Sequence, residues 1–129
     1  MRKIMIAVVL ILVLLVGVAG AQLIFVGNSK YGSNLYLVSG SIEGNTGVVV
    51  EVLSYEELAA LSAGGAPVRF ITTLVYRIEC MSSDRGRLIE LGYADGDGNI
   101  LYRERMNRSL IFNYDSPMRK ACELILNKR

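Results

Sequence analysis

The sequence contains no histidine and no tryptophan, and it has only two prolines and two cysteines among 129 residues. Without histidine the chain has no Ser-His-Asp or Cys-His catalytic group and no HExxH zinc motif, and it lacks the side chain that most often acts as a general base. It also has no P-loop, no GxSxG motif and no acid pair at a recognisable separation. Since 52% of the residues are apolar and the net charge is only +2, disordered and collagen-like chains are excluded. We therefore expect a folded domain that is not an enzyme and needs no metal or cofactor.

The first 21 residues have the pattern of an export signal. The chain starts with the basic segment Met1-Arg2-Lys3, residues 4–18 carry no charge, and Ala19-Gly20-Ala21 is a small-x-small triplet of the kind that signal peptidase cuts. A retained membrane anchor is the alternative, because a span needs about 20 apolar residues and residues 4–25 reach that length, although glycines and a glutamine interrupt them. We predict a signal peptide at residues 1–21 and a single domain at residues 22–129.

Removal of this leader changes the charge balance. It takes away Arg2 and Lys3, so the remaining 108 residues carry 12 basic and 12 acidic side chains. Nucleic-acid binding requires a net basic surface. We therefore expect no nucleic acid as a partner, and contact with a membrane only through the leader.

Both cysteines, Cys80 and Cys122, lie in the exported part of the chain. Outside the cytoplasm, two cysteines in a small domain usually form a disulfide. Such a bond would close a loop of about 43 residues and contribute at most about 4 kcal/mol to stability. The alternative is a pair of buried free thiols.

The exported part is predicted to form short strands connected by turns. The expected strands cover residues 23–26, 35–38, 47–54, 68–80, 87–94 and 100–105. In the strand at 68–80 one face carries Leu74, Tyr76, Ile78 and Cys80, and the other carries Thr73, Arg77 and Glu79 together with Val75, which predicts a half-buried strand. The next strand returns with Ile89, Leu91 and Tyr93 in register. Because the turns are short, neighbouring strands must be antiparallel.

The chain ends in a predicted helix. Ser116 is expected as the N-cap, with Pro117 at the first helical position. Met118, Ala121, Cys122 and Ile125 then repeat as one apolar stripe. Cys80 and Cys122 would both face the core, so a disulfide would join the helix to the sheet. We expect an α+β fold, with an antiparallel sheet of five or six strands and one C-terminal helix packed on a face.

Candidate binding residues are arginines and tyrosines. Arg103 and Arg105 share one face of their strand, and with Arg108 they could form a basic surface for an acidic protein or polysaccharide. The alternative is a solvated face that keeps sheet edges from pairing. The loop residues Tyr31 and Tyr55 are candidate contact anchors.

The Asp-Gly-Asp-Gly-Asn segment at residues 95–99 could also suggest a calcium site. It lacks the glycine and the carboxylate that an EF-hand loop needs at its sixth and twelfth positions, and strands flank it. A hairpin turn is the better interpretation.

The order of these features resembles the surface-adhesin protein E family. The features are the export signal, a strand ending in Gly27-Asn28, the segment Tyr36-Leu37-Val38 with Ser41-Ile42, a valine-rich strand, a long strand ending in Cys80, the Asp-Gly-Asp-Gly turn, and Ser116 six residues before Cys122. The resemblance covers residues 23–126 and implies a disulfide between Cys80 and Cys122. The family often has a tryptophan shortly before the final helix, where this chain has Phe112 and Tyr114.

The resemblance implies an exported, non-enzymatic, adhesin-like binding module in the periplasm or on the outer surface of a Gram-negative bacterium. Its expected partner is a protein, either a host matrix protein or an envelope protein, and the family leaves room for a homodimer. The alternative is a structural periplasmic component of a cell-envelope assembly. The resemblance supplies no ligand-binding residue.

Overall fold

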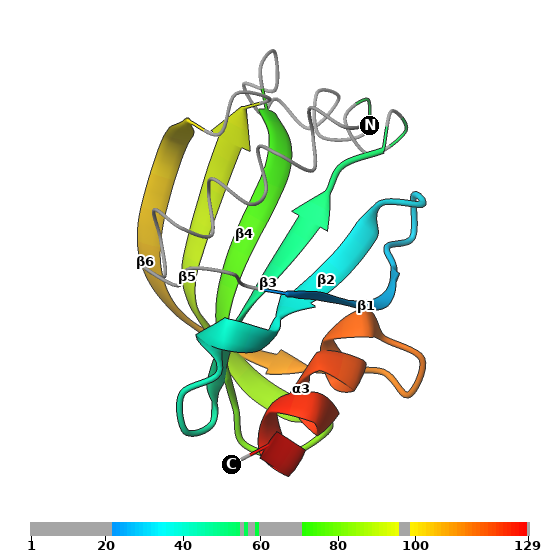
Figure 1. The fold of residues 1–129 in the computed structure, drawn as a ribbon, viewed down its shortest axis with the longest axis vertical. Helices are drawn as coiled ribbons and strands as arrows, with labels where there is room; N and C mark the ends of the chain where they lie inside the picture. The colour runs from blue at the N-terminus through cyan, green and yellow to red at the C-terminus, as the bar shows by residue number, and fades with distance from the viewer. Residues whose placement is uncertain (1–21, 55, 57–58, 60–70, 96–98, 129) are drawn as a thin grey trace.

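Figure 1 shows a computed structural model of the chain, which describes residues 22–54, 56, 59, 71–95 and 99–128. Six strands form one sheet in the order in which they occur in the sequence, and each pair of neighbours is antiparallel. The strands are β1 (Leu23–Asn28), β2 (Asn34–Val38), β3 (Thr46–Val52), β4 (Ile71–Cys80), β5 (Arg85–Asp95) and β6 (Ile100–Ile111). A 3-10 turn, η1 (Ser39–Ser41), follows β2, and the helix α3 (Pro117–Lys128) ends the chain. The predicted α+β fold is therefore confirmed.

The helix packs against one face of the sheet, which we call the helix face. Ala121, Cys122 and Ile125 are fully buried there against Leu37 of β2 and Ile78 of β4. Gly47 in β3 leaves room for this contact, since a Cβ at that position would lie 2.7 Å from the Cδ1 atom of Ile125. The apolar stripe predicted for the helix is thus the surface that it buries.

The N-terminus of α3 is capped as predicted. The backbone amide of Met118 donates a hydrogen bond to Oγ of Ser116 at 3.2 Å, and the amide of Arg119 donates to the Ser116 carbonyl at 3.1 Å. These bonds satisfy donors that have no partner within the helix. The serine therefore determines where the helix begins.

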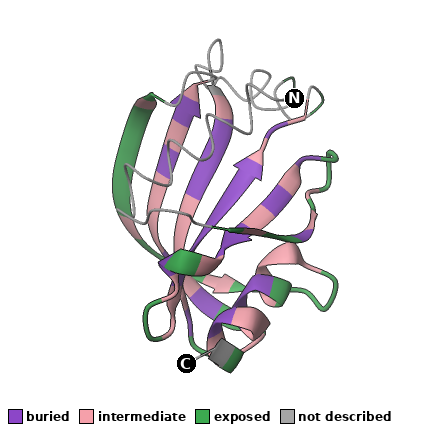
Figure 2. Cartoon of the chain, in the orientation of Figure 1, coloured by how far each residue is buried: buried purple, intermediate pink, exposed green. Residues whose placement is uncertain are grey.

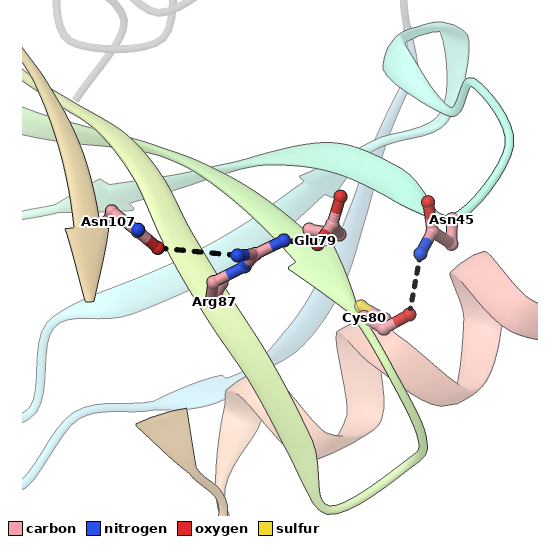
Figure 3. Close-up of polar contacts among 5 residues, drawn as sticks. All are labelled: Asn45, Glu79, Cys80, Arg87 and Asn107. Carbon is pink, nitrogen blue, oxygen red and sulfur yellow. Dashed lines mark hydrogen bonds and ion pairs between the residues drawn. The ribbon is translucent and has the colours of Figure 1, made fainter. Parts of the chain in front are cut away.

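A disulfide joins Cys80 at the end of β4 to Cys122 in α3, with the two Cα atoms 5.5 Å apart. Both cysteines are buried. The Nδ2 group of Asn45 donates to the Cys80 carbonyl at 3.1 Å (Figure 3). The Cys80 amide in turn donates to the Asn45 carbonyl at 2.8 Å. The turn before β3, which contains Asn45, therefore also holds the end of β4 from which the disulfide extends.

The opposite face of the sheet, which we call the open face, is also buried over part of its area. Val48 and Val50 of β3 lie there with Val38 and Val75, and each is at most 6% exposed. Thr73 on the same face of β4 is fully buried. The prediction that β4 is half-buried was wrong at this end of the strand, since Thr73 and Val75 are buried. Alternation of polar and apolar residues shows which side chains share a face, and it does not show whether that face is exposed. Figure 2 shows this burial along β3 and β4.

β5 contains a β-bulge that alternation alone did not predict. Ile78 pairs with Leu88 and Arg77 with Glu90, so Ile89 is an extra residue in β5 relative to β4. Leu88 enters the helix-side core, whereas Leu91 and Tyr93 stay in register with Tyr76 and Leu74. The expectation that Ile89 shares their register was wrong, because a bulge shifts the strand by one residue.

Some predictions fall outside the described residues. These are the leader at residues 1–21, the start of the strand predicted at 68–80, Tyr55, and the centre of the hairpin turn predicted at 95–99, namely residues 96–98. β6 extends to Ile111, well beyond the predicted end at residue 105. In the described part of the chain, no helix has the length and apolar character needed to cross a bilayer.

Candidate functional site

Charged side chains cross β4, β5 and β6 in rows on the open face. In one row, Arg87 of β5 binds Glu79 of β4 with 2.6 Å between Nη2 and Oε1. Its Nη1 group donates to Oδ1 of Asn107 in β6 at 3.4 Å, so that one guanidinium spans three strands (Figure 3). This row follows from the register, because Glu79 pairs with Arg87.

A second row lies further along the same strands. Glu90 of β5 pairs with Arg77 of β4 on one side and with Arg105 of β6 on the other. Nε of Arg103 donates to Oε1 of Glu90 at 2.7 Å. The Glu90 side chain is 15% exposed and that of Arg103 is 50% exposed. One shielded carboxylate therefore lies among three guanidinium groups.

These residues line an open pocket of about 440 Å³, which we call the basic pocket. Its lining consists of Arg77, Ile89, Glu90, Arg103, Arg105 and Met106. Within the described part of the chain, neither Arg77 nor Arg105 has a hydrogen bond or ion pair to another side chain. With three arginines and one glutamate, the pocket carries an excess of two positive charges. It can therefore accept anionic groups from outside the chain.

The arginine and apolar side chains of the pocket are suited to contacts with an anionic group. A guanidinium group presents a planar set of donors that matches a carboxylate in a two-bond arrangement. Ile89 and Met106 add apolar surface beside the charges, which an aliphatic or aromatic side chain of a ligand can contact. The described residues contain no group of three or more side chains of the types that hold metal ions.

The structure brings together only some of the residues that the sequence suggested. Arg103 and Arg105 line the basic pocket, as their shared strand face predicted. Arg108 pairs with Leu88, so it lies on the helix face. Tyr31 is 40% exposed in the β1–β2 connection, at the opposite edge of the sheet from β6.

The sequence-based prediction missed four pocket residues, namely Arg77, Ile89, Glu90 and Met106. Arg77 shares the polar face of its strand, but the pairing that brings it beside Glu90 depends on the register. Ile89 reaches the pocket because of the β5 bulge. The polar alternation of β4 was an available signal for Arg77, whereas no local signal marked Ile89.

On the helix face of β6, Tyr102 and Glu104 interact with each other. The Tyr102 hydroxyl donates to Oε2 of Glu104 at 2.6 Å. This hydrogen bond raises the pKa of Tyr102 above its ordinary value, because ionisation would lose the bond and place two negative charges together. Tyr102 also stacks on Tyr93, with 5.4 Å between ring centroids.

Comparison of the chain with protein-family models, with curated proteins and with solved structures found no match.

Proposed function

We propose that the chain is an exported, non-enzymatic binding module that holds an acidic segment of a protein partner in the basic pocket. The observation that carries this proposal is an open pocket in which Glu90 already binds Arg103, whereas Arg77 and Arg105 have no ion pair with any other described residue. Carboxylates from a partner would complete the arginine contacts and displace water from the apolar side chains beside them. This function agrees with the adhesin-like activity that the family resemblance implies.

The disulfide is weakly compatible with a site of action outside the cytoplasm, where such bonds persist. We place the module in the periplasm or on the outer surface of a Gram-negative cell, bound to an envelope protein or a host matrix protein. Protease treatment of intact cells distinguishes the two places, because a surface protein is digested and a periplasmic one is protected. Crosslinking in the same cells would identify an envelope assembly if the protein is a structural component of one.

The binding test uses the oxidised full chain and surface plasmon resonance against matrix proteins, envelope proteins and a synthetic glutamate-rich peptide. We expect Arg103→Glu and Arg105→Glu to weaken binding by at least about tenfold, because each brings a like charge to the bound carboxylates. Binding should also weaken as salt is added, since the pocket is open to solvent.

Lys120→Glu is the matched control, since it makes the same change of charge on an exposed position of α3. Equal losses for Lys120→Glu and the pocket variants would show that overall charge, and not the pocket, governs binding. If the folded wild-type chain bound none of these probes, the proposed function would be wrong.

A further inference from the structure

A second pocket lies on the open face, beside the turn between β4 and β5. It has a volume of about 530 Å³, and we call it the turn pocket. The register sets Ser109 opposite Arg87, whose guanidinium lies on the open face, and Ile111 opposite Arg85. The turn pocket therefore opens on the same face of the sheet as the basic pocket. Its lining consists of Met81, Arg85, Gly86, Arg87, Ser109, Leu110 and Ile111.

The turn pocket presents large apolar side chains to solvent. Met81 is 56% exposed, Ile111 is 80% exposed, and Leu110 beside Ile111 is half-buried. Apolar side chains that gather at one place on a surface are typical of an interaction site, whereas single scattered ones are not. The flexible thioether of a methionine adapts to side chains of different shape. The turn pocket can therefore accept an apolar side chain of a partner.

The surface between the two pockets is polar and carries no net charge. The Arg87 guanidinium, at the edge of the turn pocket, is neutralised by Glu79 and also donates to Oδ1 of Asn107 (Figure 3). Because Oδ1 of Asn107 is the acceptor in this bond, its Nδ2 group can donate to a backbone carbonyl of a ligand. On β6, Asn107 lies midway between Arg105 of the basic pocket and Ser109 of the turn pocket. A neutral stretch of peptide backbone is therefore the ligand that suits this middle region.

The two pockets follow the same pair of strands, and this sets the distance between them. On β5, Arg85 lies five residues before Glu90, and on β6, Ile111 lies six residues after Arg105. Since a strand rises by about 3.3 Å per residue, the centres of the two pockets are roughly 15 Å apart. About four or five residues of an extended chain cover this distance.

We propose that the acidic segment held in the basic pocket continues along β5 and β6 and places one large apolar side chain in the turn pocket. This inference rests on the proposed function, and it defines the partner's pattern as an acidic pair, a neutral stretch and an apolar residue about four or five positions away. The acidic pair meets Arg77 and Arg105, and the neutral stretch crosses Asn107. The apolar residue contacts Met81 and Ile111.

A fatty acid also combines a carboxylate with an apolar chain, but it fits these contacts less well. It has a single carboxylate, whereas Arg77 and Arg105 lie on opposite sides of Glu90, on β4 and β6. Its tail would also cover the ion pair of Arg87 with Glu79 without offering a hydrogen bond, which is costly for charged groups. A peptide backbone offers carbonyl and amide groups to the same side chains.

The test measures binding of synthetic peptides to the oxidised full chain by surface plasmon resonance. The first peptide has two glutamates, four neutral glycine and serine residues and one leucine, and the second has serine in place of the leucine. Each is made in both chain directions. We expect the leucine to tighten binding about tenfold in at least one direction, because its side chain becomes buried in the turn pocket. A spacer of one residue should abolish this gain, since the leucine then cannot reach the turn pocket.

Variants of the turn pocket identify where the leucine binds. Ile111→Ser and Met81→Ser should each remove most of the gain from leucine and leave the affinity for the serine peptide unchanged. Leu101→Ser is the matched control, because Leu101 is 49% exposed on the same strand as Ile111 and lines neither pocket. It should leave both affinities unchanged. All three side chains are exposed, so circular dichroism of these variants should match the wild type. Arg105→Glu should weaken both peptides equally.

The outcomes separate this inference from the proposed function. If the serine peptide binds and the leucine adds nothing, or if its gain persists with the short spacer or in both turn-pocket variants, the inference is overturned and the proposed function stands. If neither peptide binds, both are wrong. Laurate tests the alternative occupant. If it binds more tightly than the leucine peptide and displaces it, the ligand is a fatty acid and the inference is overturned.

Discussion

At the scale of single residues, Gly86 in β5 has no room for a side chain, because the neighbouring backbone lies too close. Gly86 lies where a Cβ would be 2.6 Å from the carbonyl oxygen of Glu79 and 3.2 Å from the Phe112 ring. Gly86 pairs here with Cys80 at the end of β4, next to the disulfide. The glycine is therefore required by packing and not by backbone freedom.

Gly86→Ala should lower the free energy of unfolding by about 2 kcal/mol, because the backbone oxygen cannot move aside as a flexible side chain would. Urea denaturation followed by circular dichroism measures the change. Gly92→Ala is the matched control in the same strand, since its added Cβ would meet only ordinary contacts at 3.5 Å or more. Equal stability of the two variants would contradict this explanation.

At the scale of elements, the turn between β4 and β5 is held by its own polar groups. The amides of Met81 and Ser82 donate to the Arg85 carbonyl at 2.9 and 3.1 Å, and Oγ of Ser82 donates to Oδ1 of Asp84 at 2.7 Å. The serine hydrogen bond is the largest cause that holds the pKa of Asp84 below its ordinary value. The ionised aspartate is therefore the form that the folded turn favours.

Ser82→Ala should raise the pKa of Asp84, as measured by an NMR titration of its carboxyl carbon. Because the pKa of Asp84 is lower in the folded than in the unfolded chain, its stabilising contribution is present above the unfolded pKa and lost as the pH falls through the folded one. The variant should accordingly lose less stability than the wild type across that acidic interval. Ser83→Ala, at the neighbouring position, is the control and should leave the titration of Asp84 unaltered.

At the scale of the whole molecule, the helix and the sheet are one unit because apolar burial and a covalent bond act at the same place. Ile125 and Ala121 pack under β2 and β3, and the Cys80–Cys122 bond fixes the middle of the helix to the end of β4. β6 reaches this end of the sheet, because its Leu110 pairs with Gly86, which in turn pairs with Cys80. The disulfide therefore joins the helix to the end of the sheet at which β4 and β6 both end.

Reduction of the disulfide should lower the free energy of unfolding by about 3 kcal/mol, since the link restricts the unfolded chain over the 42 positions that separate the cysteines. Urea titrations with and without a phosphine reductant measure the difference. The variant Cys80→Ala/Cys122→Ala should not respond to the reductant. Free thiols that alkylate in the native, unreduced protein would show that the bond does not form.

The amino-acid sequence alone indicated the order of the strands, the meander, the terminal helix and the two residues that could link helix and strand, although it placed the end of β6 six residues too early. These follow from period-two alternation, turn residues, the Ser116-Pro117 cap and the two cysteines, all of which act locally or have one possible pairing. Tertiary structure decided the remaining features, namely the β5 bulge at Ile89, the burial of Thr73 and Val75, and the position of Arg77 beside Glu90. Each of these depends on which residues meet across strands, and a shift of one residue in register changes the face on which a side chain lies.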